Sequence, residues 1–193
     1  MTEATAVKAA TLSDVETALP ELALIQDPAL RQATAEIWAE TLAESDWDTM
    51  ADAPKNPENL PTHRRLLEHS RSVALQALAV AKVVQDLHGI GFDQDILVAA
   101  ALLHDVSKLL EYGPTDSGAG KTPTGQRFQH GFLGAMKALQ HGLPQDLVHN
   151  IIVHTRHSHD LPQTWEAIIV HYVDYLDSDA LLFAEGQPLL LQK

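Results

Sequence analysis

The sequence predicts an all-α fold, and two observations lead to this expectation. Apolar residues recur at helical spacing over most of residues 13–183, in segments that end at glycine, proline or a polar run. No stretch alternates apolar and polar residues between turns, as a half-buried strand would. The 193 residues suffice for one medium-sized domain with an additional helical segment.

The first third of the chain predicts two helices and a linker. The helices lie within residues 13–47 and are separated at Asp27-Pro28, because proline favours the first turn of a helix. Residues 51–62 are rich in proline and polar residues, and we expect a linker there. The apolar side chains of the two helices are expected to pack on the core, with a homodimer contact as the alternative. They are Leu19, Leu22, Ile25, Ile37 and Trp38.

The rest of the chain predicts five further helices. They span residues 63–87, 93–112, 128–140, 144–157 and 161–183, with Pro162 in the first turn of the last helix. Gly89 and Gly91 end the first of them. The second contains the apolar run Ile96–Leu103 and should be buried nearly all round. Residues 113–127 are expected to form a long flexible loop of the kind that often binds ligands or acts as a lid.

Composition excludes several classes of protein. The chain has 0 Cys, which excludes a disulfide scaffold, a cysteine zinc site, an iron–sulfur cluster and a thiol nucleophile. A net charge of -13 and 5% aromatic residues argue against binding a long nucleic acid. No signal peptide opens the chain and no apolar run approaches the length of a membrane span. We therefore expect a cytoplasmic protein without a membrane partner.

Polar residues that can bind metals stand beside apolar helical faces. His104 and Asp105 follow the apolar run directly, where a buried carboxylate is costly unless it is paired or binds a metal. Six residues on five expected helices share this kind of setting: His69, His104, Asp105, His130, His154 and Asp174. Four histidines and two aspartates suit a two-metal site. Taken singly, each is more often an ordinary core or boundary residue, and the spacing alone leaves that alternative open.

The sequence resembles the HD-domain superfamily of metal-dependent phosphohydrolases through five motifs in the order of that family. The motifs are Leu-Leu-Glu-His69-Ser-Arg-Ser-Val, Leu-Leu-His104-Asp105-Val-Ser-Lys108, Gln-His130-Gly, Ile-Ile-Val-His154 and Val-Asp174-Tyr-Leu-Asp177. Their pattern is most similar to the HD domain of bacterial 3′→5′ exoribonucleases. The chain departs from those enzymes because it leaves no room for a separate N-terminal OB-type domain, so the polymeric substrate is not carried over.

The resemblance implies two divalent metals and a role for each motif residue. One metal would be held by His69, His104, Asp105 and Asp174. Asp105 would bridge to a second metal held by His130 and His154, and a hydroxide between the metals would attack phosphorus. Iron or manganese are the expected metals, with magnesium, cobalt, nickel and zinc as alternatives. Lys108 would orient a phosphate oxygen, although an ordinary ion-paired lysine is the competing interpretation.

Cations near the motifs are candidates for substrate binding. They are Arg64, Arg65, Lys121, Arg127 and Arg156, and ordinary surface charge is the alternative for each. Arg65 is the first choice because it stands four residues before His69. The run Gly118–Thr122 is similar to a phosphate-binding loop, but no strand precedes it and Pro123 follows where a helix should begin. We reject that motif and keep Lys121 alone as a candidate phosphate ligand.

The resemblance also implies a domain organisation and a function. Residues 1–60 would form a helical extension and linker, 61–185 the catalytic HD helical bundle, and 186–193 a tail. The expected activity is hydrolysis of a small anionic phosphoester such as a nucleotide or a short oligonucleotide. One alternative is a mixed-valent di-iron oxygenase that acts on a diol or a phosphonate. The other is a metal-binding interaction module without catalytic activity.

Overall fold

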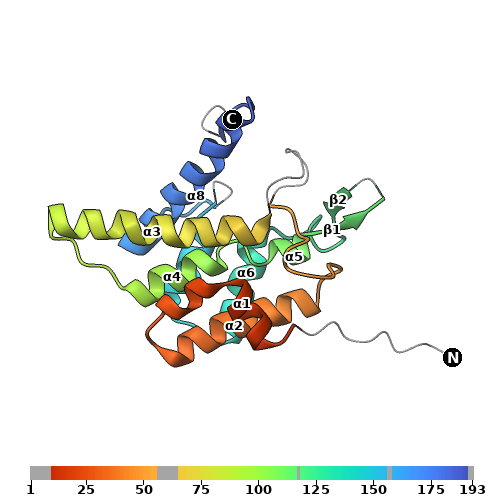
Figure 1. The fold of residues 1–193 in the computed structure, drawn as a ribbon, viewed down its shortest axis with the longest axis horizontal. Helices are drawn as coiled ribbons and strands as arrows, with labels where there is room; N and C mark the ends of the chain where they lie inside the picture. The colour runs from red at the N-terminus through yellow and green to blue at the C-terminus, as the bar shows by residue number, and fades with distance from the viewer. Residues whose placement is uncertain (1–9, 56–64, 117, 156–157, 191–193) are drawn as a thin grey trace.

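The computed structural model of the chain describes residues 10–55, 65–116, 118–155 and 158–190. The described part is built almost entirely of helices, which confirms the predicted all-α class (Figure 1). The helices are α1 (Leu12–Ala18), the 3-10 helix η1 (Pro20–Leu24), α2 (Pro28–Ala43), α3 (Leu66–His88), α4 (Gln94–Leu103), α5 (Lys108–Glu111), α6 (His130–Gln140), α7 (Gln145–Val153) and α8 (Trp165–Ala184).

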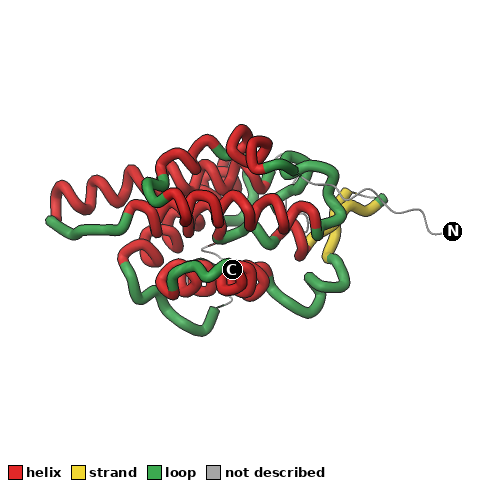
Figure 2. Tube along the Cα trace, turned by 90° about the horizontal axis from the view of Figure 1, so that it is seen from below, coloured by secondary structure: helices red, strands yellow, loops and turns green. Residues whose placement is uncertain are grey.

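The segment expected to be a long flexible loop contains a β-hairpin instead. Strands β1 (Tyr112–Thr115) and β2 (Gly118–Lys121) pair antiparallel, with Tyr112 opposite Lys121. The hairpin lies at one end of the helical body, beyond α5 (Figures 1 and 2). The sequence did not predict it because two four-residue strands rich in glycine carry no alternating apolar pattern.

Capping residues explain where several helices begin and end. Asp27 accepts hydrogen bonds from the backbone of Ala29 and Leu30, so α2 starts with Pro28 in its first turn as predicted. Gly89 ends α3 in the left-handed conformation, with φ of 67°. The start of α8 was predicted too early. Thr164 caps it by accepting from the Ala167 amide, which leaves residues 161–163 outside the helix.

The predicted helix over residues 93–112 is interrupted. Helix α4 ends at Leu103, residues 104–107 form a turn, and α5 follows as one short helical turn. The apolar run itself behaves as expected, since every residue from Leu97 to Leu103 is fully buried. Helix α4 therefore forms the centre of the molecule, with α2, α3, α7 and α8 in contact with it.

The N-terminal helices belong to the same hydrophobic core as the rest of the chain. The five apolar residues for which a dimer contact was the alternative are all buried within the chain, and their environment is this core. Trp38 also donates a hydrogen bond from Nε1 to the carbonyl of Leu102, at 3.0 Å. Among the described helices, none is both long enough and apolar enough to cross a membrane.

Candidate metal centre

Two histidines take their orientation from the helix ends on which they stand. His104 follows the last residue of α4 and His154 follows the last residue of α7. Each ring donates from Nδ1 to the carbonyl three residues earlier, Ala101 or Ile151, at 2.7 Å. With the proton on Nδ1, each Nε2 carries a lone pair that faces the interior.

The other two histidines are oriented by carboxylates that the sequence analysis did not select. His69 on α3 donates from Nδ1 to Asp177 Oδ2 at 2.7 Å, and His130 at the start of α6 donates from Nδ1 to Glu111 Oε2 at 2.7 Å. A carboxylate behind a histidine fixes its tautomer and makes the opposite nitrogen a better metal ligand. All four histidines thus present Nε2 toward one another.

Asp105 lies between these nitrogens. Its Oδ2 is 3.4 Å from Nε2 of both His69 and His104. Its Oδ1 is 3.3 Å from His130 Nε2 and 3.4 Å from His154 Nε2. Two groups of potential ligand atoms result, each with its atoms within 4.8 Å of one another: His69, His104, Asp105 and Asp174 in the first, and Asp105, His130 and His154 in the second. We call them the four-residue group and the three-residue group.

The chemistry of this donor set fits bound cations. Asp105 Oδ1 is buried and has no hydrogen-bond partner among the described residues, which is costly for a carboxylate oxygen. The Nε2 atoms of His69 and His104 lie only 3.1 Å apart, and those of His130 and His154 lie 3.3 Å apart. The pKa values of His130 and His154 are lowered by burial, and the Nδ1 protons of both rings are donated elsewhere, so this second pair brings two lone pairs together. A divalent metal with nitrogen and oxygen ligands would satisfy both features.

Comparison with known proteins agrees with this geometry. The model of the HD domain family matches residues 66–179. The chain belongs to the HD domain family. It is also similar to the dihydroneopterin 2′,3′-cyclic phosphate phosphodiesterase of Methanocaldococcus jannaschii, with 30% identity over 136 residues. That alignment covers 68% of this chain and 55% of the relative, so the chain spans about half of the relative's length. No solved structure matches the chain.

The match confirms the predicted HD-domain resemblance and places all six candidate ligands inside the HD domain. It runs from the first residue of α3 into α8 and omits α1, α2 and residues 51–55. The particular similarity to exoribonucleases stays a prediction.

The charge of the two candidate-ligand aspartates, Asp105 and Asp174, is balanced by buried lysines. Burial opposes ionisation of Asp105, but Lys108 and His104 outweigh it and hold the pKa of Asp105 well below its usual range. Burial likewise opposes ionisation of Asp174, where Lys55 and His69 keep the pKa well below its usual range. Both aspartates are therefore ready to bind a cation at neutral pH.

The histidines differ in their protonation. Burial lowers the pKa of both His130 and His154, so their rings stay neutral and able to bind metal below the pH at which a free histidine is protonated. The pKa of His69 is raised, although burial and Lys55 oppose this, because Asp105, Asp174 and Asp177 favour its charged form.

The candidate substrate-binding cations have different environments. Lys108 Nζ lies 2.7 Å from Asp105 Oδ2, and Lys121 Nζ lies 3.4 Å from Glu111 Oε1, so both are next to residues of the metal centre. Arg65 precedes α3 and donates to the carbonyl of Asp52, while Arg127 donates to the carbonyl of Pro123. Arg64 and Arg156 lie outside the described residues.

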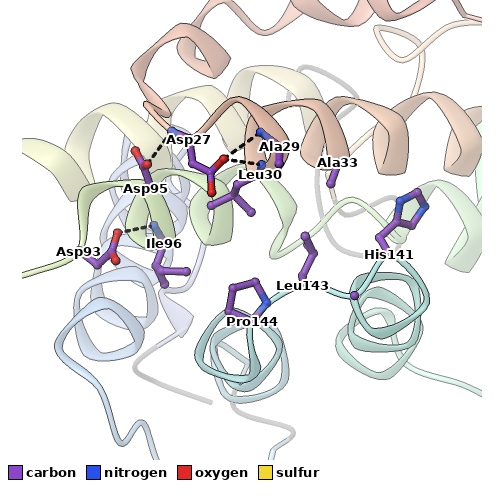
Figure 3. A pocket seen from close by; sticks show the side chains of 11 residues that line it. Asp27, Ala29, Leu30, Ala33, Asp93, Asp95, Ile96, His141, Leu143 and Pro144 are labelled. Carbon is purple, nitrogen blue, oxygen red and sulfur yellow. Dashed lines mark hydrogen bonds between the residues drawn. The ribbon is translucent and has the colours of Figure 1, made fainter.

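A separate pocket of about 420 Å³ lies at the N-terminal end of α4, whereas the metal centre follows its C-terminal end. It is lined by residues of α2, of the start of α4 and of the turn after α6 (Figure 3). Its carboxylates already have structural roles, since Asp27 caps α2 and Asp93 accepts from the Ile96 amide. None of the six candidate ligands lines this pocket.

Proposed function

We propose that the protein is a metal-dependent phosphohydrolase that cleaves a small phosphoester. The observation that carries this proposal is the position of Asp105, whose two oxygens each face a separate pair of histidine Nε2 atoms. Membership of the HD domain family and similarity to a phosphodiesterase support the same class of reaction. Two divalent metals held there, with iron or manganese preferred, would lower the pKa of water and stabilise charge on a phosphoryl group.

The protein's own residues would orient the ligands and bind the anionic substrate. Glu111 and Asp177 hold two histidine rings, so these carboxylates act on the ligands and not on the substrate. Lys108 keeps Asp105 ionised and lies close enough to the ligands to contact a phosphate oxygen. Lys121 is the more accessible cation, with 35% of its side chain exposed, and would attract the substrate at the edge of the site.

We propose a monomeric or short phosphodiester as the substrate, with a cyclic phosphate as the first compound to test. The relative is named for a 2′,3′-cyclic phosphate of dihydroneopterin. Nucleotides and short oligonucleotides carry the same phosphodiester group. A net charge of -13 disfavours a long polyanion, since only a local cluster of cations would oppose the general repulsion.

The proposal is tested by measuring metal content and turnover on the same preparation. Protein purified without oxygen should contain about two iron or manganese ions per chain. It should hydrolyse at least one member of a panel of 2′,3′-cyclic nucleotides, dihydroneopterin 2′,3′-cyclic phosphate, dinucleotides and nucleoside monophosphates. Asp105→Ala should lose both metal and turnover. Asp86→Ala, which removes an exposed carboxylate paired with Lys82, should lose neither.

Each other outcome rejects a defined part of the proposal. Protein that holds two metals but cleaves no phosphoester would be a metal-stabilised module and not a hydrolase. Oxygen uptake with a phosphonate or a diol would identify the di-iron oxygenase alternative. Protein that binds no metal, with Asp105→Ala indistinguishable from wild type, would reject the metal centre itself.

A further inference from the structure

A buried lysine from outside the matched HD domain contacts a candidate metal ligand. Lys55 lies before α3, and only 2% of its surface is exposed. Its Nζ is 3.2 Å from Asp174 Oδ1, and it also donates a close hydrogen bond to Ser178 Oγ. The same Asp174 oxygen lies 3.0 Å from His69 Nε2. A metal in the four-residue group and the Lys55 ammonium would therefore share one carboxylate oxygen.

The position of Lys55 is fixed by the start of α3. The Leu66 amide donates to the carbonyl of Ala53 at 2.9 Å, and Arg65 Nη1 donates to the carbonyl of Asp52 at 2.9 Å. Pro54 and Arg65 also form a β-bridge. The segment that carries Lys55 is thus attached to the helix that carries His69, about one turn before that ligand. Arg65, expected to bind substrate, here anchors this segment.

We propose that Lys55 is a built-in counter-cation of the four-residue group, which balances Asp174 without metal and weakens metal binding there. An ionised carboxylate in a buried site needs a nearby positive charge, and Lys55 supplies it. A divalent cation on the same oxygen would lie within a few ångströms of the ammonium, where like charges repel strongly in a poorly solvated site. The inference rests on the metal-binding part of the proposed function.

The effect should be specific to one of the two metal groups. Asp174 belongs to the four-residue group, whereas the three-residue group relies on Asp105 Oδ1, for which the described part of the chain provides no hydrogen-bond partner. Metal binding at the four-residue group must therefore overcome a competing ammonium on Asp174. The N-terminal segment, which lies outside the matched HD domain, would thereby set the affinity of a metal site inside that domain.

The test is a titration of metal-free protein with Mn²⁺ by calorimetry. The measurements are made in a His130→Ala background, because this change removes a ligand of the three-residue group and leaves the other group complete. Lys55→Met removes the charge and keeps most of the side-chain length. We expect the Mn²⁺ dissociation constant to fall by about tenfold or more, since a competing charge is lost.

Lys137→Met in the same background is the matched control. Lys137 is also buried, and its Nζ pairs with the more exposed Glu44 Oε1 at 2.5 Å, so the variant removes the ion pair of a buried lysine without touching a candidate ligand. We expect its Mn²⁺ affinity to equal that of the background protein. A purely structural role for Lys55 would instead weaken Mn²⁺ binding in Lys55→Met or leave it unchanged, and either result overturns the inference.

Thermal unfolding gives a second readout that stays informative if Lys55→Met is unstable. Without metal, the variant should melt below its parent, because Asp174 loses its partner charge. Saturating Mn²⁺ should remove this difference in melting temperature, or restore folding if the metal-free variant is unfolded. The difference in melting temperature between Lys137→Met and its parent should not depend on metal. The inference is contradicted if Mn²⁺ does not reduce the difference in melting temperature between Lys55→Met and its parent. If the wild-type chain binds no Mn²⁺, the proposed metal centre fails and the inference fails with it.

Discussion

Each of the four histidines in the candidate metal centre donates a hydrogen bond from Nδ1 to an acceptor, and the acceptors are of two kinds. His104 and His154 use backbone carbonyls of their own helices, which no side-chain substitution can remove. His69 and His130 use the carboxylates of Asp177 and Glu111. Only the second kind can be removed without changing a ligand, so it offers a direct test of how ring orientation affects metal binding.

We predict that Asp177→Ala weakens metal binding by about 10- to 100-fold, because His69 loses the acceptor that fixes its tautomer and orientation. The measurement is the Mn²⁺ dissociation constant of protein first freed of metal. Asp179→Ala is the control on the same helix, since Asp179 accepts from the Leu190 amide and belongs to neither group of candidate ligands. Equal affinities for the two variants would show that His69 needs no carboxylate behind it.

The residues that orient or balance the six candidate ligands could not be selected from the sequence. The six could be selected because each stands beside apolar residues in an ordered motif. Asp177 and Lys55 act on residues 108 and 119 positions away along the chain, and Glu111 acts 19 positions away. Nothing local separates such residues from ordinary surface charges, because only the packing of α3, α8 and α5 brings them to the site.

The turn that follows the hairpin packs against the end of α5 and thereby supports the metal centre. The Thr122 amide and hydroxyl donate to the carbonyls of Glu111 and Leu110, and the Gly125 amide donates to Thr122 Oγ1. A Cβ atom at Gly125 would lie 2.0 Å from the Glu111 carbonyl oxygen. The backbone of Glu111, whose side chain holds His130, therefore approaches this turn too closely for any side chain to fit.

We predict that Gly125→Ala lowers the free energy of unfolding by about 2 kcal/mol or more, because the backbones must separate to admit a methyl group. The same displacement moves Glu111, so the variant should also retain less metal after dialysis. Gly91→Ala is the control, since a Cβ there meets no atom within 4 Å, and its stability should change by less than about 0.5 kcal/mol. Urea unfolding and metal analysis measure both effects. Retention of full stability in Gly125→Ala would mean that this turn can separate from α5 at no cost.

The start of α2 and the end of α3 were more predictable than the interruption between α4 and α5. Asp27, Pro28 and Gly89 are local signals, and the structure uses them as expected. The pattern of residues 93–112 continues without a breaker, yet the helix stops before His104. The contacts at this point are tertiary: Ser107 Oγ donates to the carbonyl of His130, and Trp38 donates to that of Leu102. The helical spacing of apolar residues in the sequence does not reveal such contacts.

The buried charges of the candidate metal centre make the stability of the whole protein depend on pH. The pKa values of four carboxyl groups are lowered by folding although burial opposes this: Asp105, Asp174, Asp177 and Glu111. A carboxyl group whose pKa is lower in the folded chain contributes stability above its unfolded value, about 4. That contribution is lost as the pH falls further, through the pKa values that these groups have in the folded protein.

The histidines add an earlier step on acidification. Burial lowers the pKa of His130 and His154 below the usual value of 6.5, so the unfolded chain takes up their protons first and stability falls as the pH drops below about 6.5. His69 has a raised pKa and acts in the opposite direction, since its contribution is present below about 6.5 and is lost as the pH rises through its folded value. The contribution of His130 and His154 is therefore measured by comparing variants.

We predict that His130 and His154 destabilise metal-free protein in a first step as the pH falls below about 6.5, and that the four carboxyl groups add a second loss below about 4. Urea unfolding between pH 7.5 and pH 3.5 measures this profile. His130→Gln should reduce the first step, because one of the two histidines with a lowered pKa is gone. It should keep most of the second step, because only Glu111 among the four carboxyl groups is hydrogen-bonded to His130. His88→Gln, at an exposed helix end, is the control and should preserve both steps. Identical profiles for His130→Gln and the wild-type protein from pH 7.5 to pH 5 would contradict the neutral state of His130, on which metal binding at the three-residue group depends.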